Sequence, residues 1–276
     1  MKFVQQLAKQ GVSVRKLTSI FGVARSKIYR KRINFNEKYQ NIVDKIYDIY
    51  MNNVSYGYRR IHQTLLRNNI KINKKTVHKL MKINNLFARY PKKRHKKLIK
   101  NDRQFISKYL LKNIEINRKN QVWATDITYL KTTKGIMYLS AIIDIYSRYI
   151  VGWKIGNTMD TRLCTDTLND AVASQNVTPM IINSDQGSQY TSSSWHELVK
   201  SINSQLSMDG IGRWADNIYI ERFWNTVKNE ELRYHKFESV SDLKKTVNNF
   251  INYYNNSRLH SSLSYKTPSE VYLELY

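Results

Sequence analysis

The stretch QVWATDITYLKTTKGIMYLSAIIDIYSRYIVGWKI, residues 121–155, decides the fold of the chain. Three runs in it are rich in β-branched, aromatic and aliphatic side chains, namely Val122 to Leu130, Met137 to Tyr146 and Tyr149 to Ile155. Turn-forming residues separate the runs, with Gly135 after the first and Ser147-Arg148 after the second. The stretch therefore predicts three antiparallel strands joined as a meander.

The segment after the meander predicts a helix and a further strand. From Asp160 to Ala173 the spacing is helical, and the residues expected to face inward are Leu163, Thr167, Leu168 and Ala171. A short buried strand is expected from Met180 to Asn183. Strands followed by alternating helix and strand are typical of a mixed α/β sheet rather than of a sandwich.

Residues 13–32 predict a helix-turn-helix. Apolar residues stand at helical spacing at Leu17, Ile20, Val23 and Ile28, and Gly22 lies where the turn must be tight. The second helix carries the basic residues Arg25, Lys27, Arg30, Lys31 and Arg32. In the DNA-reading form of this motif, the second helix lies in the major groove. The alternative is a two-helix corner that does not touch DNA.

A second helical unit is expected next. Its first helix runs from about Glu37 to Tyr50 with Ile42, Ile46 and Ile49 on one face, Gly57 breaks the pattern, and further helices follow from Arg59 and over Lys74 to Ile83. The basic run from Pro91 to Lys97 is either a solvated linker or a linker that also tracks DNA phosphates. We predict four parts: a helix-turn-helix at 1–35, a second DNA-binding unit at 36–90, a basic linker at 91–115, and a catalytic core with a C-terminal helical extension at 116–276.

The charge of the chain is large and unevenly placed. The formal net charge is +25, and residues 1–100 hold 26 Lys and Arg against three acidic residues, while the remainder holds 20 against 18. Clustered cations displace counterions from a phosphate backbone, so nucleic acid is the expected partner. The basic N-terminal part is expected to hold phosphates, and the rest has the carboxylates that metal-dependent chemistry needs.

Cys164 is the only cysteine, so a disulfide framework and a cysteine-rich zinc site are excluded. A reducing cytoplasm is the expected location, and DNA as the partner places the protein at the nucleoid. No secretion signal and no apolar run of about 20 residues occurs, so we expect no membrane-spanning segment. Binding to a membrane surface through the basic part remains an alternative.

Three acidic residues are candidates for metal ligation. Two Mg²⁺ ions about 4 Å apart can run phosphodiester cleavage, and such hard cations need several carboxylates at one point. Asp126 lies in mid-strand, where a buried ionised side chain is costly without a cation. Asp185 ends the strand of residues 180–183 at the rim of the sheet, although Asp before a glycine turn is also ordinary.

Glu221 stands on a predicted helix that begins near Asp216-Asn217. Its buried stripe is expected to comprise Ile220, Phe223, Trp224 and Val227, with Asn217, Glu221, Asn225 and Lys228 as a polar stripe beside it. Lys228 lies two turns from Glu221 and is expected to contact DNA phosphate. An exposed surface helix is the plain alternative.

Other polar residues receive different interpretations. Asp144 is expected to pair with Arg148, with metal ligation as the alternative, and Asp216 is expected to cap the Glu221 helix rather than to bind metal. Glu230 and Glu231 lie too far along that helix to share its site. For Arg258 and His260, contact with DNA and stabilisation of the domain both stay open.

At these residues the sequence resembles the OrfB-type DDE transposases of bacterial insertion sequences, relatives of retroviral integrase. The matching segments are Asn120 to Tyr129, Ser184 to Tyr190, Asp216-Asn217 with Glu221 to Trp224 and Lys228, Tyr253 to His260, Thr267 to Glu270, and Tyr56 to Ile61. Thirty-five residues separate Asp185 from Glu221, which is typical of the family. The segment Met208 to Ala215 departs from the family pattern and leaves the local DNA contacts open.

The resemblance implies an RNase-H-like core with a mixed five-stranded sheet and flanking helices, preceded by an all-α DNA-binding region. It implies two Mg²⁺ or Mn²⁺ ions on Asp126, Asp185 and Glu221. Strand cleavage then exposes a 3′-hydroxyl that attacks a new phosphodiester, often after the element's ends are joined into a circle. Arg25, Lys27, Arg30, Arg59, Arg60 and Lys228 are the expected DNA-binding residues.

The partners expected from this resemblance are DNA and other protein chains. The DNA comprises the terminal inverted repeats of the transposon and the target. Because two ends must be held together, a homodimer or larger complex on DNA is expected. The product of an upstream reading frame, separate or fused by frameshifting, is a further expected partner.

Three other functions compete with transposition. A metal-dependent nuclease would use the same triad but needs no helix-turn-helix for specific ends. A DNA-binding regulator with a decayed catalytic half is a second alternative, against which the intact triad argues. A tyrosine or serine recombinase needs an activated nucleophile with positioned Arg and His partners, and the sequence has no such cluster.

Overall fold

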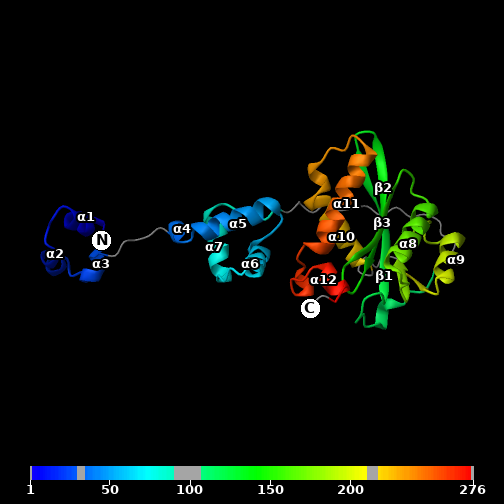
Figure 1. The fold of residues 1–276 in the computed structure, drawn as a ribbon, viewed down its shortest axis with the longest axis horizontal. Coiled ribbons are helices and arrows are strands. Elements are labelled where there is room, and N and C mark those ends of the chain that lie inside the picture. Colours follow the sequence, from blue (N-terminus) through cyan, green and yellow to red (C-terminus); the bar gives the residue numbers. More distant parts are fainter. Residues whose placement is uncertain (1, 30–34, 90–106, 210–216, 275–276) are drawn as a thin grey trace. The chain divides into compact units, whose positions relative to one another are not determined.

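The computed structural model describes residues 2–29, 35–89, 107–209 and 217–274 (Figure 1). It divides into two compact units, Met1–Phe87 and Ala88–Tyr276. Each unit has buried clusters of its own and is described by itself. Within the described ranges, no helix combines the length and apolar character needed to cross a bilayer.

The first unit begins with three short helices, α1 (Lys2–Lys9), α2 (Val14–Phe21) and α3 (Arg25–Tyr29). Val4, Leu17 and Ile28 form their small core. Helix α2 ends at Gly22, whose φ of 59° is a left-handed conformation that glycine adopts without steric cost. The predicted pair of helices with a tight turn at Gly22 is therefore present.

Four further helices complete this unit, α4 (Phe35–Lys38), α5 (Gln40–Asn52), α6 (Tyr58–Arg67) and α7 (Lys74–Ile83). The prediction of one helix from Glu37 to Tyr50 is wrong, because Tyr39 leaves the helical conformation between α4 and α5. The buried face of α5 is formed by Val43, Ile46 and Tyr50, while the predicted Ile42 and Ile49 are only partly buried against it.

The second unit is built on a five-stranded sheet in the order β3-β2-β1-β4-β5. Its strands are β1 (Val122–Thr132), β2 (Gly135–Asp144), β3 (Ile150–Gly156), β4 (Ile181–Ser184) and β5 (Gln205–Met208). The first three pair antiparallel, whereas β4 runs parallel to β1 and β5 runs parallel to β4. The predicted meander and the mixed five-stranded sheet are both confirmed.

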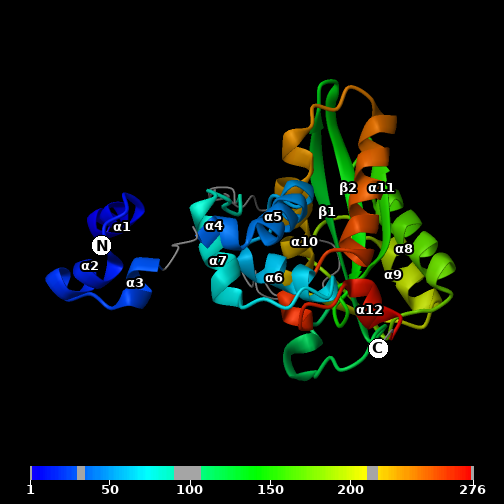
Figure 2. The same ribbon diagram turned by 60° about the vertical axis from the view of Figure 1, so that its left-hand side comes forward.

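Helices cover both faces of this sheet (Figures 1 and 2). One face packs on α8 (Thr161–Gln175) and α9 (Ser193–Ser201), the other on α10 (Ile218–Glu230) and α11 (Val240–Asn256). Successive β1 residues alternate between the faces, so Trp123 belongs to the core under α8 and α9, and Ala124 to the core under α10 and α11.

A Cβ added at Gly152 would lie 2.6 Å from the Cβ of Ala171, so the close approach of α8 to β3 requires glycine there.

Short elements complete the second unit. These are η1 (Leu111–Asn113), η2 (Leu232–Tyr234), η3 (Ser261–Leu263) and α12 (Pro268–Tyr272). Helix α12 opens with a capping box, in which the Thr267 hydroxyl accepts from the Glu270 backbone N–H and the Glu270 carboxylate accepts from the Thr267 N–H. This start fixes the direction in which the C-terminal segment leaves the core.

Candidate active site

Asp126 lies near the middle of β1, the central strand of the sheet. Because side chains alternate along a strand, Asp126 points to the same face as Ala124, the face that α10 covers. Its Oδ1 accepts a hydrogen bond from the backbone N–H of Ile127 at 2.8 Å, and its Oδ2 accepts one from Trp224 Nε1 at 2.8 Å. The carboxylate is therefore oriented from both sides.

The surroundings of Asp126 disfavour its negative charge. Burial raises its pKa to about 7, and the charge of Asp185 adds to the rise. The hydrogen bonds from Trp224 and Ile127 lower the pKa, and the charge of Glu221 raises it. Asp126 is thus a carboxylate whose ionised form needs a neighbouring positive charge.

Asp185 directly follows β4, which is the parallel neighbour of β1. The pairing places Asn183 opposite Ala124, and continuing this register by two residues on each strand brings Asp185 beside Asp126. Asp185 is exposed, and its Oδ1 accepts from the backbone N–H of Gly187 at 2.9 Å. This is the predicted position at the rim of the sheet.

Glu221 stands in the first turn of α10, and its side chain is exposed. Its helix is anchored by the predicted stripe, since Ile220, Phe223, Trp224 and Val227 are all buried. Trp224 lies three residues after Glu221 and therefore on the same side of the helix. The hydrogen bond from Trp224 to Asp126 holds this side of α10 against β1.

The three acidic residues are neighbours, but they do not form a closed ligand cage. Both Asp185 and Glu221 act on the pKa of Asp126 through their charge. Within the ranges that the structure describes, however, no group of three His, Cys, Asp or Glu side chains is already arranged to hold a metal ion. The structure therefore shows the three charges interacting, without a formed metal site among the described residues.

Trp224 has a role that sequence reasoning missed. The helical spacing identified its ring as part of the buried stripe, and its indole also donates to a candidate ligand. A buried indole N–H usually finds an acceptor. Applied to a buried tryptophan one turn from Glu221, this rule predicts that the indole of Trp224 donates a hydrogen bond to a nearby acceptor.

Lys228 lies on the same side of α10, two turns beyond Glu221. Its ammonium group donates to the Thr128 hydroxyl and lies 4.6 Å from the centre of the Tyr129 ring. Thr128 is two residues after Asp126 and points to the same face of β1. The structure thus places Lys228 beside the candidate site, half-buried rather than on an open surface.

Asn217, predicted to lie on the same polar stripe, is buried and donates to the Thr125 carbonyl.

The predicted pairing of Asp144 with Arg148 is present only as an interaction of their charges, because no ion pair within 4 Å joins these two described side chains. The buried carboxylate of Asp144 accepts from Asn120 N at 2.7 Å, from Ser147 N at 2.8 Å and from Ser147 Oγ at 2.6 Å. The Arg148 guanidinium instead lies 3.8 Å from the centre of the Tyr219 ring. Burial raises the pKa of Asp144, and these neutral donors counteract the rise.

Asp216, predicted to cap α10, lies outside the described residues, and the residue before the helix is Asn217.

Arg258 has a structural role. Its guanidinium is buried and donates to both carboxylate oxygens of Glu230, at 2.8 and 2.7 Å. Its third nitrogen lies 3.3 Å from His260 Nε2. Because Glu230 ends α10 and Arg258 follows α11, this pair joins the two helices. Of the two predicted alternatives, stabilisation of the domain is the one that these contacts support.

The predicted DNA-binding residues of the first unit lie on helices. Arg25 and Lys27 are exposed on α3, while Arg30 falls outside the described residues. On α6, Arg59 lies over the Tyr58 ring at 5.7 Å and Arg60 over the Tyr56 ring at 5.3 Å. Their contact with DNA stays a prediction. The run from Pro91 to Lys97 also lies outside the described residues.

Families of known proteins match most of the chain. Residues 116–213 match the integrase core domain, and residues 203–268 match a second family of the same description. Residues 37–94 match an HTH-like domain. The HTH-like match thus covers the second predicted helical unit, not residues 13–32.

Individual relatives agree with these families. The chain is 34% identical, over 78% of its length and 86% of the relative, to the transposase for insertion sequence element IS904 of Lactococcus lactis. It is 29% identical, over 100% of its length and 99% of the relative, to the putative transposase InsK for IS150 of Escherichia coli. The HTLV-2 integrase catalytic core domain matches 56% of this chain and 97% of its own, with 19% identity and a TM-score of 0.46. Given the integrase core, the HTH-like segment and the two transposase relatives, the chain belongs to the OrfB-type transposases of bacterial insertion sequences.

Proposed function

We propose that this transposase cleaves and joins DNA strands at one site, where Asp126, Asp185 and Glu221 hold two Mg²⁺ or Mn²⁺ ions. The observation that carries the proposal is the position of Asp126, which is oriented by Trp224 and destabilised as an anion by burial and by the two other carboxylates. Carboxylates held close together against their own repulsion are typical of a site that binds cations.

The donor set fits hard divalent cations. All three residues supply carboxylate oxygens, the ligands that Mg²⁺ prefers, and an ionised carboxylate has about four acceptor positions. Each oxygen of Asp126 therefore keeps acceptor capacity beyond its one hydrogen bond. The side chains of Asp185 and Glu221 are exposed, so rotation towards Asp126 needs no repacking of the core.

The site residues have separate tasks in the reaction. When bound, the ions supply activation of the attacking oxygen and stabilisation of the leaving oxygen. Asp126 provides the fixed ligand, since Trp224 and Ile127 hold its orientation. Lys228 offers a cation beside this point for a phosphate of the bound strand. Water is the first nucleophile at each transposon end, and the resulting 3′-hydroxyl is the second.

The remaining expectations concern partners. The basic part of residues 1–100, with Arg25, Lys27, Arg30, Arg59 and Arg60, binds the terminal inverted repeats, and the second unit receives the target. Holding two ends together requires at least two copies of the chain on DNA. The product of an upstream reading frame, separate or fused, and association with the nucleoid complete this proposal.

The test compares Asp126→Asn, Asp185→Asn and Glu221→Gln with the wild type. Each substitution keeps the shape of the side chain but removes its charge, so strand transfer from a supercoiled donor in Mg²⁺ is expected to fall at least roughly 10³-fold. Binding of Mn²⁺, followed by electron paramagnetic resonance, is expected to weaken in parallel. Binding of transposon ends in a gel-shift assay is expected to persist.

The matched control is Asp170→Asn, which removes an exposed carboxylate on α8 that lies 2.9 Å from Lys154. It is expected to leave both strand transfer and Mn²⁺ binding unchanged. Strand transfer by Asp126→Asn at the wild-type rate in Mg²⁺ would overturn the proposal. Cleavage without any strand transfer by the wild type would identify a nuclease instead.

A further inference from the structure

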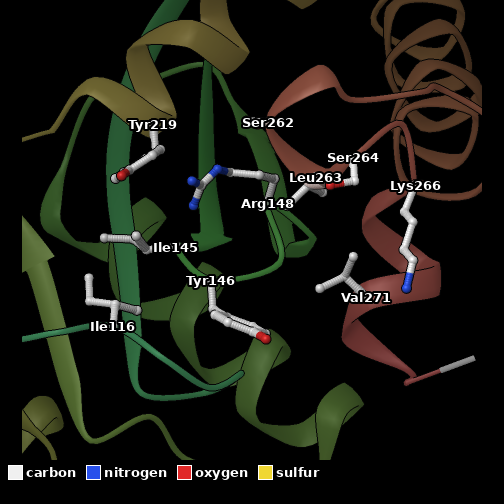
Figure 3. A pocket seen from close by; sticks show the side chains of 10 residues that line it. All are labelled: Ile116, Ile145, Tyr146, Arg148, Tyr219, Ser262, Leu263, Ser264, Lys266 and Val271. Carbon is white, nitrogen blue, oxygen red and sulfur yellow. The ribbon is translucent and has the colours of Figure 1, made fainter. Parts of the chain in front are cut away.

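A pocket of about 410 Å³ lies in the second unit, and none of the three candidate carboxylates lines it (Figure 3). It is formed by the turn after β2, the start of α10, the segment between α11 and α12, α12 itself, and the segment before β1. The lining residues are Ile116, Ile145, Tyr146, Arg148, Tyr219, Ser262, Leu263, Ser264, Lys266 and Val271. Its volume falls within the range of about 300–1,000 Å³ that is typical of small-molecule sites.

The lining is cationic. It contains Arg148 and Lys266 and no acidic residue, and the two cations come from different segments (Figure 3). The buried Asp144 carboxylate, which accepts from Asn120 and Ser147, acts on Arg148 through its charge but does not line the pocket. The charge of this lining therefore favours an anion.

Arg148 is held in place by the fold around it. Its φ of 64° is left-handed, a conformation that costs a non-glycine residue roughly 1 kcal/mol or more. The turn is fixed because the backbone N–H of Arg148 donates to the Asp144 carbonyl at 2.8 Å, while the Asp144 side chain holds Ser147. The strained turn places the guanidinium over Tyr219, so this cation is already ordered before any ligand arrives.

The rest of the lining is aromatic and apolar. Tyr146 and Tyr219 are both half-buried, and Ile116, Leu263 and Val271 add apolar surface. A simple phosphate site has no need of such walls. A nucleotide does, because its base stacks on aromatic rings while its phosphate contacts cations. A base enters a pocket of this kind only when it is unpaired and unstacked.

We propose that this pocket binds one unpaired nucleotide of a DNA strand, with the base against Tyr146 and beside the Arg148 guanidinium that lies over Tyr219, and with the phosphate at Arg148 and Lys266. Tyr219 precedes Glu221 by two residues on α10, so a strand held there lies beside the helix that carries a candidate ligand. The inference goes beyond the proposed metal site, because nucleotide binding in the pocket needs no metal ion.

The test uses the full chain with a single-stranded oligonucleotide that contains 5-iodouracil, in EDTA. Residues 1–100 carry most of the net charge and bind any DNA, so overall affinity would not report on this pocket. Light-induced crosslinking followed by mass spectrometry reports on single residues. We expect crosslinks at Tyr146 or Tyr219, and a lower yield from the same sequence as a duplex.

Three variants make the result specific. Arg148→Gln and Lys266→Gln each remove one pocket cation and are expected to lower the yield at these tyrosines roughly fivefold or more. Lys200→Gln removes an exposed cation on α9, which packs on the other face of the sheet, and is expected to change nothing. Asp126→Asn is also expected to leave the crosslinks in place, which separates this inference from the metal proposal.

Crosslinks that map only to residues outside the pocket would overturn the inference. The inference would also be overturned if neither Arg148→Gln nor Lys266→Gln changed the crosslinking yield at Tyr146 and Tyr219. If Arg148→Gln does not fold, Lys266→Gln carries the test, since its side chain is half-exposed and the backbone bridge between Lys266 and His260 is kept.

Discussion

The indole Nε1 of Trp224 donates a hydrogen bond to Oδ2 of Asp126 at 2.8 Å. The two residues are 98 positions apart, one on α10 and one on β1. The bond joins the helix that carries Glu221 to the strand that carries Asp126. It therefore orients the Asp126 carboxylate and holds the part of α10 that carries Glu221 against β1.

Trp224→Phe is expected to reduce strand transfer and Mn²⁺ affinity by about 10- to 100-fold, the usual effect of losing a partner that orients a metal ligand. The hydrogen bond from Trp224 lowers the pKa of Asp126, so its loss raises that pKa further above the ordinary value. Ionised Asp126 then requires a higher pH. The acidic limb of Mn²⁺ binding is expected to move to higher pH, measured by titration at several pH values.

Trp195→Phe is the matched control for that prediction. Trp195 is fully buried in the opposite core, and its Nε1 has no hydrogen-bond partner among the described residues. The substitution removes the same atoms from a packed site and is expected to lower the melting temperature without moving the pH profile. Equal effects of both substitutions on Mn²⁺ binding would show that packing, not the Asp126 contact, is responsible.

Lys228→Gln is expected to weaken binding of transposon-end DNA to the catalytic site, because it removes one cation beside Asp126. The slope of log affinity against log salt is expected to decrease by about 1, as for one phosphate contact. Thr128→Val keeps the charge and removes only the hydroxyl that Lys228 contacts, so it is expected to preserve the slope. An unchanged slope in Lys228→Gln would contradict a phosphate contact.

Glu230→Gln is expected to destabilise the protein by about 3–5 kcal/mol, because it leaves the buried Arg258 guanidinium without its charged partner. Urea denaturation measures the change in the free energy of unfolding. Glu274→Gln breaks the ion pair between Lys119 and Glu274, whose carboxylate side chain is 60% exposed, and is expected to cost no more than about 1 kcal/mol. Similar losses in both variants would contradict a structural role for the buried pair.

Cys164 is expected to resist alkylation in the native protein at pH 8. Burial raises the pKa of its thiol to about 12, and only the thiolate reacts rapidly. The folded state therefore keeps the proton between about pH 9 and 12, and the contribution of this group to stability is lost as pH rises through that range. Iodoacetamide labelling in increasing urea measures it, and rapid labelling without urea would contradict the prediction.

The sequence by itself determined the elements and the candidate ligands of this protein. Runs of β-branched, aromatic and aliphatic residues from Val122 to Ile155, with turn residues between them, predicted the meander. The stripe from Ile220 to Val227 predicted α10, because both patterns express local geometry. Two short elements, α9 and β5, were not predicted. Helix α9 begins with two serines after the capping Ser192, and β5 has only four residues, two of them polar, so neither carries a clear period.

The tertiary structure alone decided which distant side chains meet. Nothing local pairs β4 with β1, joins Trp224 to Asp126, or places Arg148 over Tyr219. These contacts depend on the order of strands in the sheet and on the rotation of α10 about its own axis. Both are set when apolar surfaces from separate parts of the chain pack together, so no single segment encodes them.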